Sequence, residues 1–199
     1  MYPPPHHQIN DRNKMIAVIK QYPLSMMVTA QNGKPYISHI PLIYNKNTGK
    51  LVGHMDRNNP QVDTLQSGDG VQLVFKGPDT YISPSIYTTE QLPTWNYIIV
   101  HLIGTVSVID EPDTIKRSMV EMTRYLEAPD HKYSLSIDDP KMDLFVQYIH
   151  AFEIEITEWE GKFKLSQDKC EQDQINAKEQ LMRRVNKDKM DSILKKILK

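Results

Sequence analysis

One stretch of the sequence decides the fold: Trp95-Asn96-Tyr97-Ile98-Ile99-Val100-His101-Leu102-Ile103-Gly104-Thr105-Val106-Ser107-Val108-Ile109. It is rich in β-branched and aromatic residues, which favour strands. Gly104 offers a point at which a long strand can bend. The most apolar part, residues 97–109, is interrupted by His101, Thr105 and Ser107 and is shorter than the about 20 residues that a membrane-spanning helix needs. The pattern therefore predicts a long core strand.

Shorter segments on both sides predict further antiparallel strands. Leu24–Ala30 and Pro35–Tyr44 flank Asn32-Gly33, the dipeptide that most readily adopts the positive φ angles of a tight hairpin turn. Phe152, Ile154 and Ile156 alternate with polar residues, which indicates a half-buried strand. Further strands are expected at Lys50–Met55, Val71–Phe75 and Thr80–Ser83, with a hairpin return strand at Gly161–Leu165.

Helical segments are expected between and around the strands. The first begins at an Asn10 or Asp11 cap and ends before Pro23, because both cap types favour helix starts and proline disfavours continuation. Others are expected from Pro60, from Asp110 to before Pro129, and over 139–149. This order predicts an α+β, mainly β fold: a six- to seven-stranded antiparallel split β-barrel with peripheral helices, rather than a doubly wound parallel sheet.

Composition restricts the class of protein. The chain has 199 residues, 24 Lys+Arg and 25 Asp+Glu, which indicates one or at most two globular domains. Cys170 is the only cysteine, so a disulfide-stapled scaffold and a zinc ribbon are both excluded. No signal-peptide pattern opens the sequence, and the expected location is the reducing cytoplasm, with no membrane partner.

The charge is distributed unevenly. Residues 178–199 contain eight Lys/Arg and three acidic residues, whereas the whole chain has a net charge of -1. An apolar stripe also runs through this segment at helical spacing: Met190, Ile193, Leu194, Ile197 and Leu198. We therefore predict two parts, a domain over 1–170 and a basic amphipathic helical extension over 171–199. The basic face is either a solvated surface or a contact for nucleic acid.

Common catalytic motifs are missing from the sequence. It contains no Gly-x-Gly-x-x-Gly, Walker-type loop, His-Glu-x-x-His or Gly-x-Ser-x-Gly motif, so no motif supports a dinucleotide, P-loop, zinc-protease or α/β-hydrolase function. The seven histidines form no i, i+4 pair on a helix, and we expect no metal site. They are His6, His7, His39, His54, His101, His131 and His150.

Three polar patches interrupt the predicted β structure: residues 53–58, 81–85 and 93–97. Polar side chains in a sheet core require hydrogen bonds or a ligand. A planar cofactor with a phosphate needs such groups, and Arg57 supplies a forked cation at a predicted helix start. The alternative is that these are loops capped by their own side chains.

Several of these strings together resemble the PaiB family, described as FMN-binding negative transcriptional regulators. The matching strings are Met1-Tyr2-x-Pro4-x-His6, Ser38-His39-Ile40-Pro41-Leu42, Gly53-His54-Met55-x-Arg57-x-Asn59-Pro60, Phe75-x-Gly77-Pro78-x-x-Tyr81-Ile82-Ser83-Pro84-Ser85, Pro93-Thr94-Trp95-Asn96-Tyr97, Val100-His101 and Gly161-Lys162-Phe163-Lys164-Leu165-Ser166-Gln167. They run in order from the first residue to about residue 170.

The resemblance implies a flavin-binding split barrel that forms a homodimer, with FMN in clefts at the subunit interface. We expect four residues near the phosphate: Arg57, Asn58, Ser83 and Lys164. Four others are expected near the flavin ring or ribityl chain: His54, Trp95, Asn96 and Tyr97. The chain departs from the usual family pattern at His7, Ile86 and Asp168, where Phe, Trp and Asn are usual.

Three functional alternatives stay open at this point. The chain can be an FMN-binding regulator, an FMN-dependent oxidoreductase that uses NAD(P)H, or, more remotely, a haem-binding protein of the same fold. No catalytic acid or base is assigned, since the flavin itself would carry the hydride. Contact with DNA, if the regulator hypothesis holds, is expected through residues 178–199 because only this segment is strongly basic.

Overall fold

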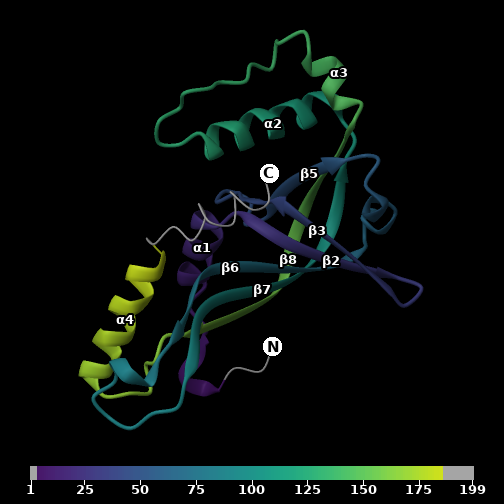
Figure 1. The fold of residues 1–199 in the computed structure, drawn as a ribbon. Helices are drawn as coiled ribbons and strands as arrows, with labels where there is room; N and C mark the ends of the chain where they lie inside the picture. Colours follow the sequence, from purple (N-terminus) through teal and green to yellow (C-terminus); the bar gives the residue numbers. More distant parts are fainter. Residues whose placement is uncertain (1–3, 186–199) are drawn as a thin grey trace, which may run out of the picture. The chain divides into compact units, whose positions relative to one another are not determined.

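The computed structural model describes residues 4–185, whose helices and strands are shown in Figure 1. These residues form two compact units. The larger unit contains residues 11–75 and 100–160, and the smaller unit contains residues 4–10, 76–99 and 161–185. Three long strands contribute residues to both units: β6 (Gly70–Ile82), β7 (Thr94–Ile109) and β8 (Ile149–Lys164).

The strands form one eight-stranded sheet in the order β3-β2-β6-β7-β8-β5-β4, and β1 pairs with β8. The remaining strands are β1 (Gln8–Ile9), β2 (Leu24–Gln31), β3 (Lys34–Pro41), β4 (Ile43–Tyr44) and β5 (Leu51–Asp56). The pairs β1–β8, β2–β3, β2–β6, β4–β5 and β5–β8 are antiparallel. The mainly antiparallel prediction is confirmed, and within residues 4–185 the end strands β3 and β4 do not pair, so the sheet is not a closed barrel.

Two of the predicted strand breaks are wrong. The break expected between Phe75 and Thr80 lies inside continuous β6. There Gly77 lets β7 approach closely, since a Cβ at this position would lie 3.1 Å from Cβ of Ile98. The hairpin turn expected before Gly161 is also absent, because β8 runs on to Lys164 and Gly161 pairs with Ile9 of β1.

Two local signals, the Asn32-Gly33 turn and the Asp11 cap, are confirmed, and the cap expected at Asp110 is wrong. The β2–β3 hairpin turns through Asn32 and Gly33, with φ angles of 51° and 77°, as a type I′ turn requires. The Asp11 side chain accepts a hydrogen bond from the Asn13 N–H at 2.9 Å and caps the first helix. The cap expected at Asp110 is instead provided by Glu111, which accepts hydrogen bonds from the Asp113 and Thr114 N–H groups.

The helices are α1 (Arg12–Gln21), α2 (Pro112–Leu126), α3 (Met142–Val146) and α4 (Glu171–Val185). Short 3₁₀ turns lie at η1 (Pro5–His7), η2 (Pro60–Thr64) and η3 (Pro84–Ile86). The helix expected over 139–149 is therefore only the five-residue α3. None of the helices in residues 4–185 has the length and apolar character needed to cross a membrane. The predicted basic segment continues past α4 into residues 186–199, which lie outside the described part of the chain.

The two units have interiors of different character. The larger unit is packed with apolar side chains such as Ile19, Leu51, Phe75, Leu102 and Phe152, which are at most 1% exposed. In the described residues of the smaller unit, the buried hydrophobic side chains are Ile82 and Ala177 alone. Five polar residues are buried there: His7, Thr80, Asn96, Ser166 and Asp173. Burying polar groups is unfavourable unless they are paired or bind a ligand, so this interior points to a site.

Candidate functional site

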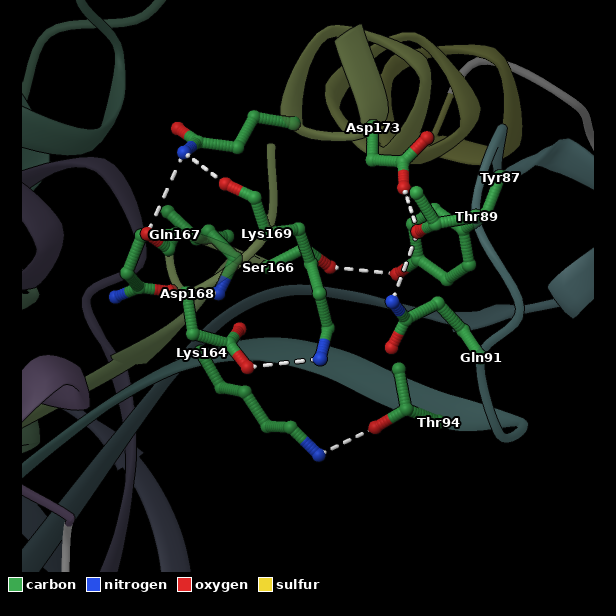
Figure 2. Close-up of polar contacts among 12 residues, drawn as sticks. Tyr87, Thr89, Gln91, Thr94, Lys164, Ser166, Gln167, Asp168, Lys169 and Asp173 are labelled. Carbon is green, nitrogen blue, oxygen red and sulfur yellow. Dashed lines mark hydrogen bonds and ion pairs between the residues drawn. The ribbon is translucent and has the colours of Figure 1, made fainter. Parts of the chain in front are cut away.

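A pocket of about 340 Å³ lies within the smaller unit. Its walls come from four segments: η1, the loop that precedes β7, the end of β8, and the turn that follows β8. The lining residues are His7, Gln91, Leu92, Pro93, Thr94, Lys164, Ser166, Asp168 and Lys169. Figure 2 shows most of these side chains and their polar contacts.

The buried hydroxyl of Ser166 is the centre of a polar network at this pocket. Its Oγ lies 2.8 Å from the Tyr87 hydroxyl, and it accepts a hydrogen bond from Nδ2 of buried Asn96 at 3.0 Å. Ser166 has a left-handed backbone with φ of 64°, which is uncommon for a residue other than glycine. The Gln167 side chain supports this turn by accepting a hydrogen bond from the Leu165 N–H at 2.7 Å. Three segments therefore meet at one oxygen atom.

Two ammonium groups line the pocket (Figure 2). Lys164 Nζ donates to the Thr94 hydroxyl, and Lys169 Nζ lies 2.9 Å from Oδ2 of Asp168. Burial acts to raise the pKa of Asp168, but the hydrogen bond and charge of Lys169 outweigh it, so this pKa lies below its usual value. The carboxylate therefore neutralises part of the positive charge, while Lys164 has a hydroxyl as its partner.

His7 is 6% exposed, and neither of its ring nitrogens has a hydrogen-bond partner among the described residues. Burial lowers the pKa of His7, and the nearby His6 lowers it further. The two imidazoles lie edge to face with their centroids 4.1 Å apart. At neutral pH His7 is therefore a neutral, buried imidazole with an unsatisfied lone pair.

The loop that leads to the pocket is held by α4. Asp173, buried in the first turn of this helix, accepts a hydrogen bond from the Thr89 hydroxyl at 2.7 Å, as Figure 2 shows. Asn176 Nδ2 donates to the carbonyl of Ile86 at 2.7 Å. These contacts fix the loop that carries Gln91 and Leu92 to the pocket.

Of the eight predicted site residues, Lys164 and Asn96 belong to this cluster. Ser83, Trp95 and Tyr97 lie in the same unit but do not line the pocket. Ser83 Oγ accepts a hydrogen bond from the Ser85 N–H at 3.3 Å and caps η3. Trp95 is 51% exposed and donates from Nε1 to Asp79 at 2.8 Å. Tyr97 has the Lys162 ammonium 5.4 Å from its ring centroid.

The other three predicted residues, His54, Arg57 and Asn58, lie in the larger unit. Burial lowers the pKa of His54, and its Nδ1 is buried with no hydrogen-bond partner among the described residues. Arg57 is exposed and donates from Nε to the Ile149 carbonyl at 2.9 Å. Asn58 donates from Nδ2 to Asp56 at 2.9 Å. The contacts of Asn58 and Ser83 agree with self-capped loops, and the cofactor roles of all eight residues stay predictions.

Several residues of the pocket and of its polar network were not among the predicted ones: His7, Tyr87, Thr94, Asp168 and Lys169. Thr94 lies in one of the three polar patches, but its position next to Lys164 depends on the pairing of distant segments. For His7 the sequence offers no signal, because a histidine beside a proline-rich turn does not show what it will contact.

A family model described as "Putative FMN-binding domain" matches residues 1–158. The chain belongs to this FMN-binding domain family. The resemblance to PaiB is confirmed by Protease synthase and sporulation protein PAI 2 of Bacillus subtilis (strain 168), which is 30% identical over 189 residues, spanning 94% of this chain and 91% of that protein. Another relative, Uncharacterized protein AN0679 of Emericella nidulans, is 26% identical over 76% of this chain and 78% of that protein.

Solved structures confirm the split-barrel type of fold for this member of the FMN-binding domain family. The FAD and heme binding protein from Mycobacterium smegmatis superposes with a TM-score of 0.65 and 19% identity, over 79% of this chain and 73% of that chain. The flavocytochrome Anf3 from Azotobacter vinelandii gives a TM-score of 0.59 and 14% identity, over 79% and 69% of the two chains. At these identities the likeness concerns the fold.

Proposed function

We propose that this chain binds FMN and that Lys164 contributes to the site of the flavin phosphate. The observation that carries the proposal is the pairing of Lys164 with the Thr94 hydroxyl at a pocket that Lys169 and Ser166 also line. Charge-assisted hydrogen bonds from ammonium groups and hydroxyls are what a phosphate dianion requires. Membership in the FMN-binding domain family supports this choice of ligand over other phosphates.

The size and chemistry of the pocket fit such a ligand. Its volume of about 340 Å³ falls within the range of about 300–1,000 Å³ typical of small-molecule sites. Among the lining residues in the described part of the chain, only Asp168 carries a carboxylate that would repel a phosphate, and Lys169 pairs with it. When bound, the flavin would supply electron and hydride transfer chemistry. The protein side chains would bind and orient it.

The proposal includes a homodimer. Leu92 and Trp95 are large apolar side chains of the smaller unit that are 84% and 51% exposed. Exposed apolar groups near a ligand pocket are typical of surfaces that a partner covers, and a second copy of the chain is the partner expected from the family resemblance. A flavin ring at such an interface would be shielded from water by both copies.

A regulatory role is the further part of the proposal. The basic residues of 178–199 would contact DNA, and α4 presents exposed Lys178 and Arg183 at the start of this segment. Binding of duplex DNA would then weaken as salt rises, because phosphate contacts release counterions. Deleting 178–199 should abolish binding. Unchanged DNA affinity after this deletion would exclude the segment as the contact.

An absorbance spectrum of the purified protein, followed by a fluorescence titration with FMN and light scattering, tests the proposal. A yellow dimer, or uptake of FMN by a colourless dimer at micromolar concentration, is the expected result. A protein that leaves FMN fluorescence unchanged at millimolar concentration contradicts it.

With FMN bound, oxidation of NADH or NADPH above that of free flavin would assign the oxidoreductase alternative instead of a purely regulatory role. A Soret band in the absorbance spectrum would indicate haem.

A further inference from the structure

A second cluster is formed by His6, His7 and Asp168, and two of these residues, His7 and Asp168, also line the pocket described above. One potential ligand atom from each residue lies within 4.8 Å of the other two. The residues are far apart in the sequence, and the pairing of β1 with β8 brings them together, since Gln8 pairs with Lys162. Two imidazoles from η1 thus face a carboxylate in the turn that follows β8.

The state of His7 is a separate observation that points to a ligand. Its ring is 6% exposed, and both nitrogens are buried without a hydrogen-bond partner among the described residues. A buried polar group normally finds a partner, and an unpaired one is unfavourable. A ligand that accepts the lone pair of one imidazole nitrogen would give that nitrogen a partner.

We propose that His6, His7 and Asp168 bind a divalent transition-metal ion, with Zn²⁺ as the ion that the ligand set fits best. Imidazole nitrogens and one carboxylate oxygen are common zinc ligands, and water would complete a tetrahedral shell. Bonds of about 2.0–2.1 Å place ligand atoms about 3.4 Å apart in a tetrahedron. The three groups would therefore close from their separation of up to 4.8 Å, which side-chain rotations of exposed His6 and Asp168 can supply.

The neighbouring charges decide which class of ion is expected. Lys169 Nζ lies 2.9 Å from Oδ2 of Asp168, and Lys164 lines the same pocket. These ammonium groups repel a divalent cation, so the affinity for the metal must come from coordination bonds rather than from the local electrostatic potential. Ca²⁺ and Mg²⁺ depend on several oxygen ligands, and only one carboxylate is present, whereas transition metals bind imidazole strongly.

A bound metal would link η1 to the turn that carries Ser166 and Lys169. It would hold the N-terminal segment against the pocket wall without using the groups proposed for the flavin phosphate. The proposal does not rest on flavin binding, so the two can fail separately.

The test is a Zn²⁺ titration of the full chain after treatment with a chelator and without an affinity tag or flavin, read by competition with a chromophoric chelator. Co²⁺ absorption in the visible region reports the ligand geometry. The variants are His6→Gln, His7→Phe and Asp168→Asn. His39→Gln is the matched control, because His39 is an exposed histidine of the other unit.

We expect one Zn²⁺ per chain, with affinity reduced about tenfold or more in each ligand variant and unchanged in His39→Gln. His7→Phe keeps a buried aromatic ring, and if it fails to fold, His6→Gln and Asp168→Asn decide the matter because both residues are exposed. No binding by the unmodified chain would overturn the proposal. Equal affinity in His6→Gln and His39→Gln would do the same.

Discussion

The carboxylate of Asp173 accepts two hydrogen bonds from Thr88, one from the backbone N–H at 2.6 Å and one from the hydroxyl at 2.8 Å. Both reach Oδ1, while Oδ2 accepts from Thr89. This relationship joins the first turn of α4 to the loop between η3 and β7. Because that loop supplies Gln91 and Leu92 to the pocket, the order of the pocket wall depends on a buried charge.

The stability of this contact should depend on pH in the acid range. Burial acts to raise the pKa of Asp173, but the hydrogen bonds from Thr88 and Thr89 lower it from 3.8 to about 2. A carboxyl whose pKa is depressed in the folded state stabilises it fully above the unfolded pKa, and this contribution is lost as pH falls towards the folded pKa. Urea unfolding of the unmodified protein should therefore show a loss of stability between about pH 4 and pH 2.

Asp173→Asn should flatten this part of the stability profile and lower stability at pH 7. Asp138→Asn is a suitable control, because Asp138 is exposed and its side chain accepts no hydrogen bond within residues 4–185. Parallel profiles for the Asp173 variant and the unmodified chain between pH 4 and pH 2 would contradict the assignment.

Local signals in the sequence predicted the parts of the fold that local chemistry fixes. Asn32-Gly33 set the β2–β3 turn, and Asp11 set the start of α1. Gly161 was predicted at the start of a hairpin return strand because alternation resumes after it at Phe163 and Leu165. Its pairing with Ile9 joins distant segments, and single-sequence periodicity does not show such a pairing.

The site was predictable only in part for the same reason. Lys164 was correctly placed on a strand with alternating faces, but Thr94 as its partner follows from strand order. The approach of Asp168 to the adjacent His6 and His7 likewise depends on the pairing of β1 with β8. Polar residues inside predicted β structure were the most useful signal, since Asn96 lies in the buried network.

Gly104 is predicted to be sensitive to substitution because of close packing. A Cβ there would lie 2.6 Å from the Glu155 carbonyl oxygen on β8, and a backbone atom cannot move aside as a side chain can. Gly104→Ala should lower the free energy of unfolding by about 1–3 kcal/mol, the usual cost of overpacking. Urea denaturation monitored by tryptophan fluorescence measures this change.

Gly70→Ala is the control for this prediction, because Gly70 is the first residue of β6 and a Cβ there meets nothing within 4 Å. This variant should unfold near the midpoint of the unmodified chain. Similar midpoints for Gly104→Ala and the unmodified chain would show that β7 and β8 separate freely at this point.

Separate substitutions of Lys164 and Arg57 test which of these two cations contacts the flavin phosphate. Lys164→Ala should weaken FMN binding by at least about tenfold, since a charged hydrogen bond contributes about 1.5–3 kcal/mol. Arg57→Ala should do the same if Arg57 also contacts the phosphate. Fluorescence titration with FMN, and with riboflavin, which lacks the phosphate, measures both effects.

Lys14→Ala serves as the control, because Lys14 is an exposed lysine of α1. A phosphate role predicts that Lys164→Ala weakens FMN more than riboflavin. Equal loss for both ligands would assign Lys164 to folding of the pocket, and no loss for FMN would remove it from the site. The same comparison of FMN and riboflavin affinities in Arg57→Ala tests whether Arg57 contacts the phosphate.

A charge at position 92 should weaken the proposed dimer. The Leu92 side chain is 84% exposed, and burying a leucine side chain contributes about 1.5–3 kcal/mol. In a two-fold symmetric interface each substitution acts twice. Leu92→Glu should therefore raise the dimer dissociation constant by well over about tenfold, as measured by sedimentation equilibrium. Leu126→Glu, at a position 48% exposed on α2, tests whether any added charge has this effect. An unmodified chain that sediments as a monomer would exclude the dimer. A Leu92→Glu dimer of unchanged affinity would place the subunit contact elsewhere.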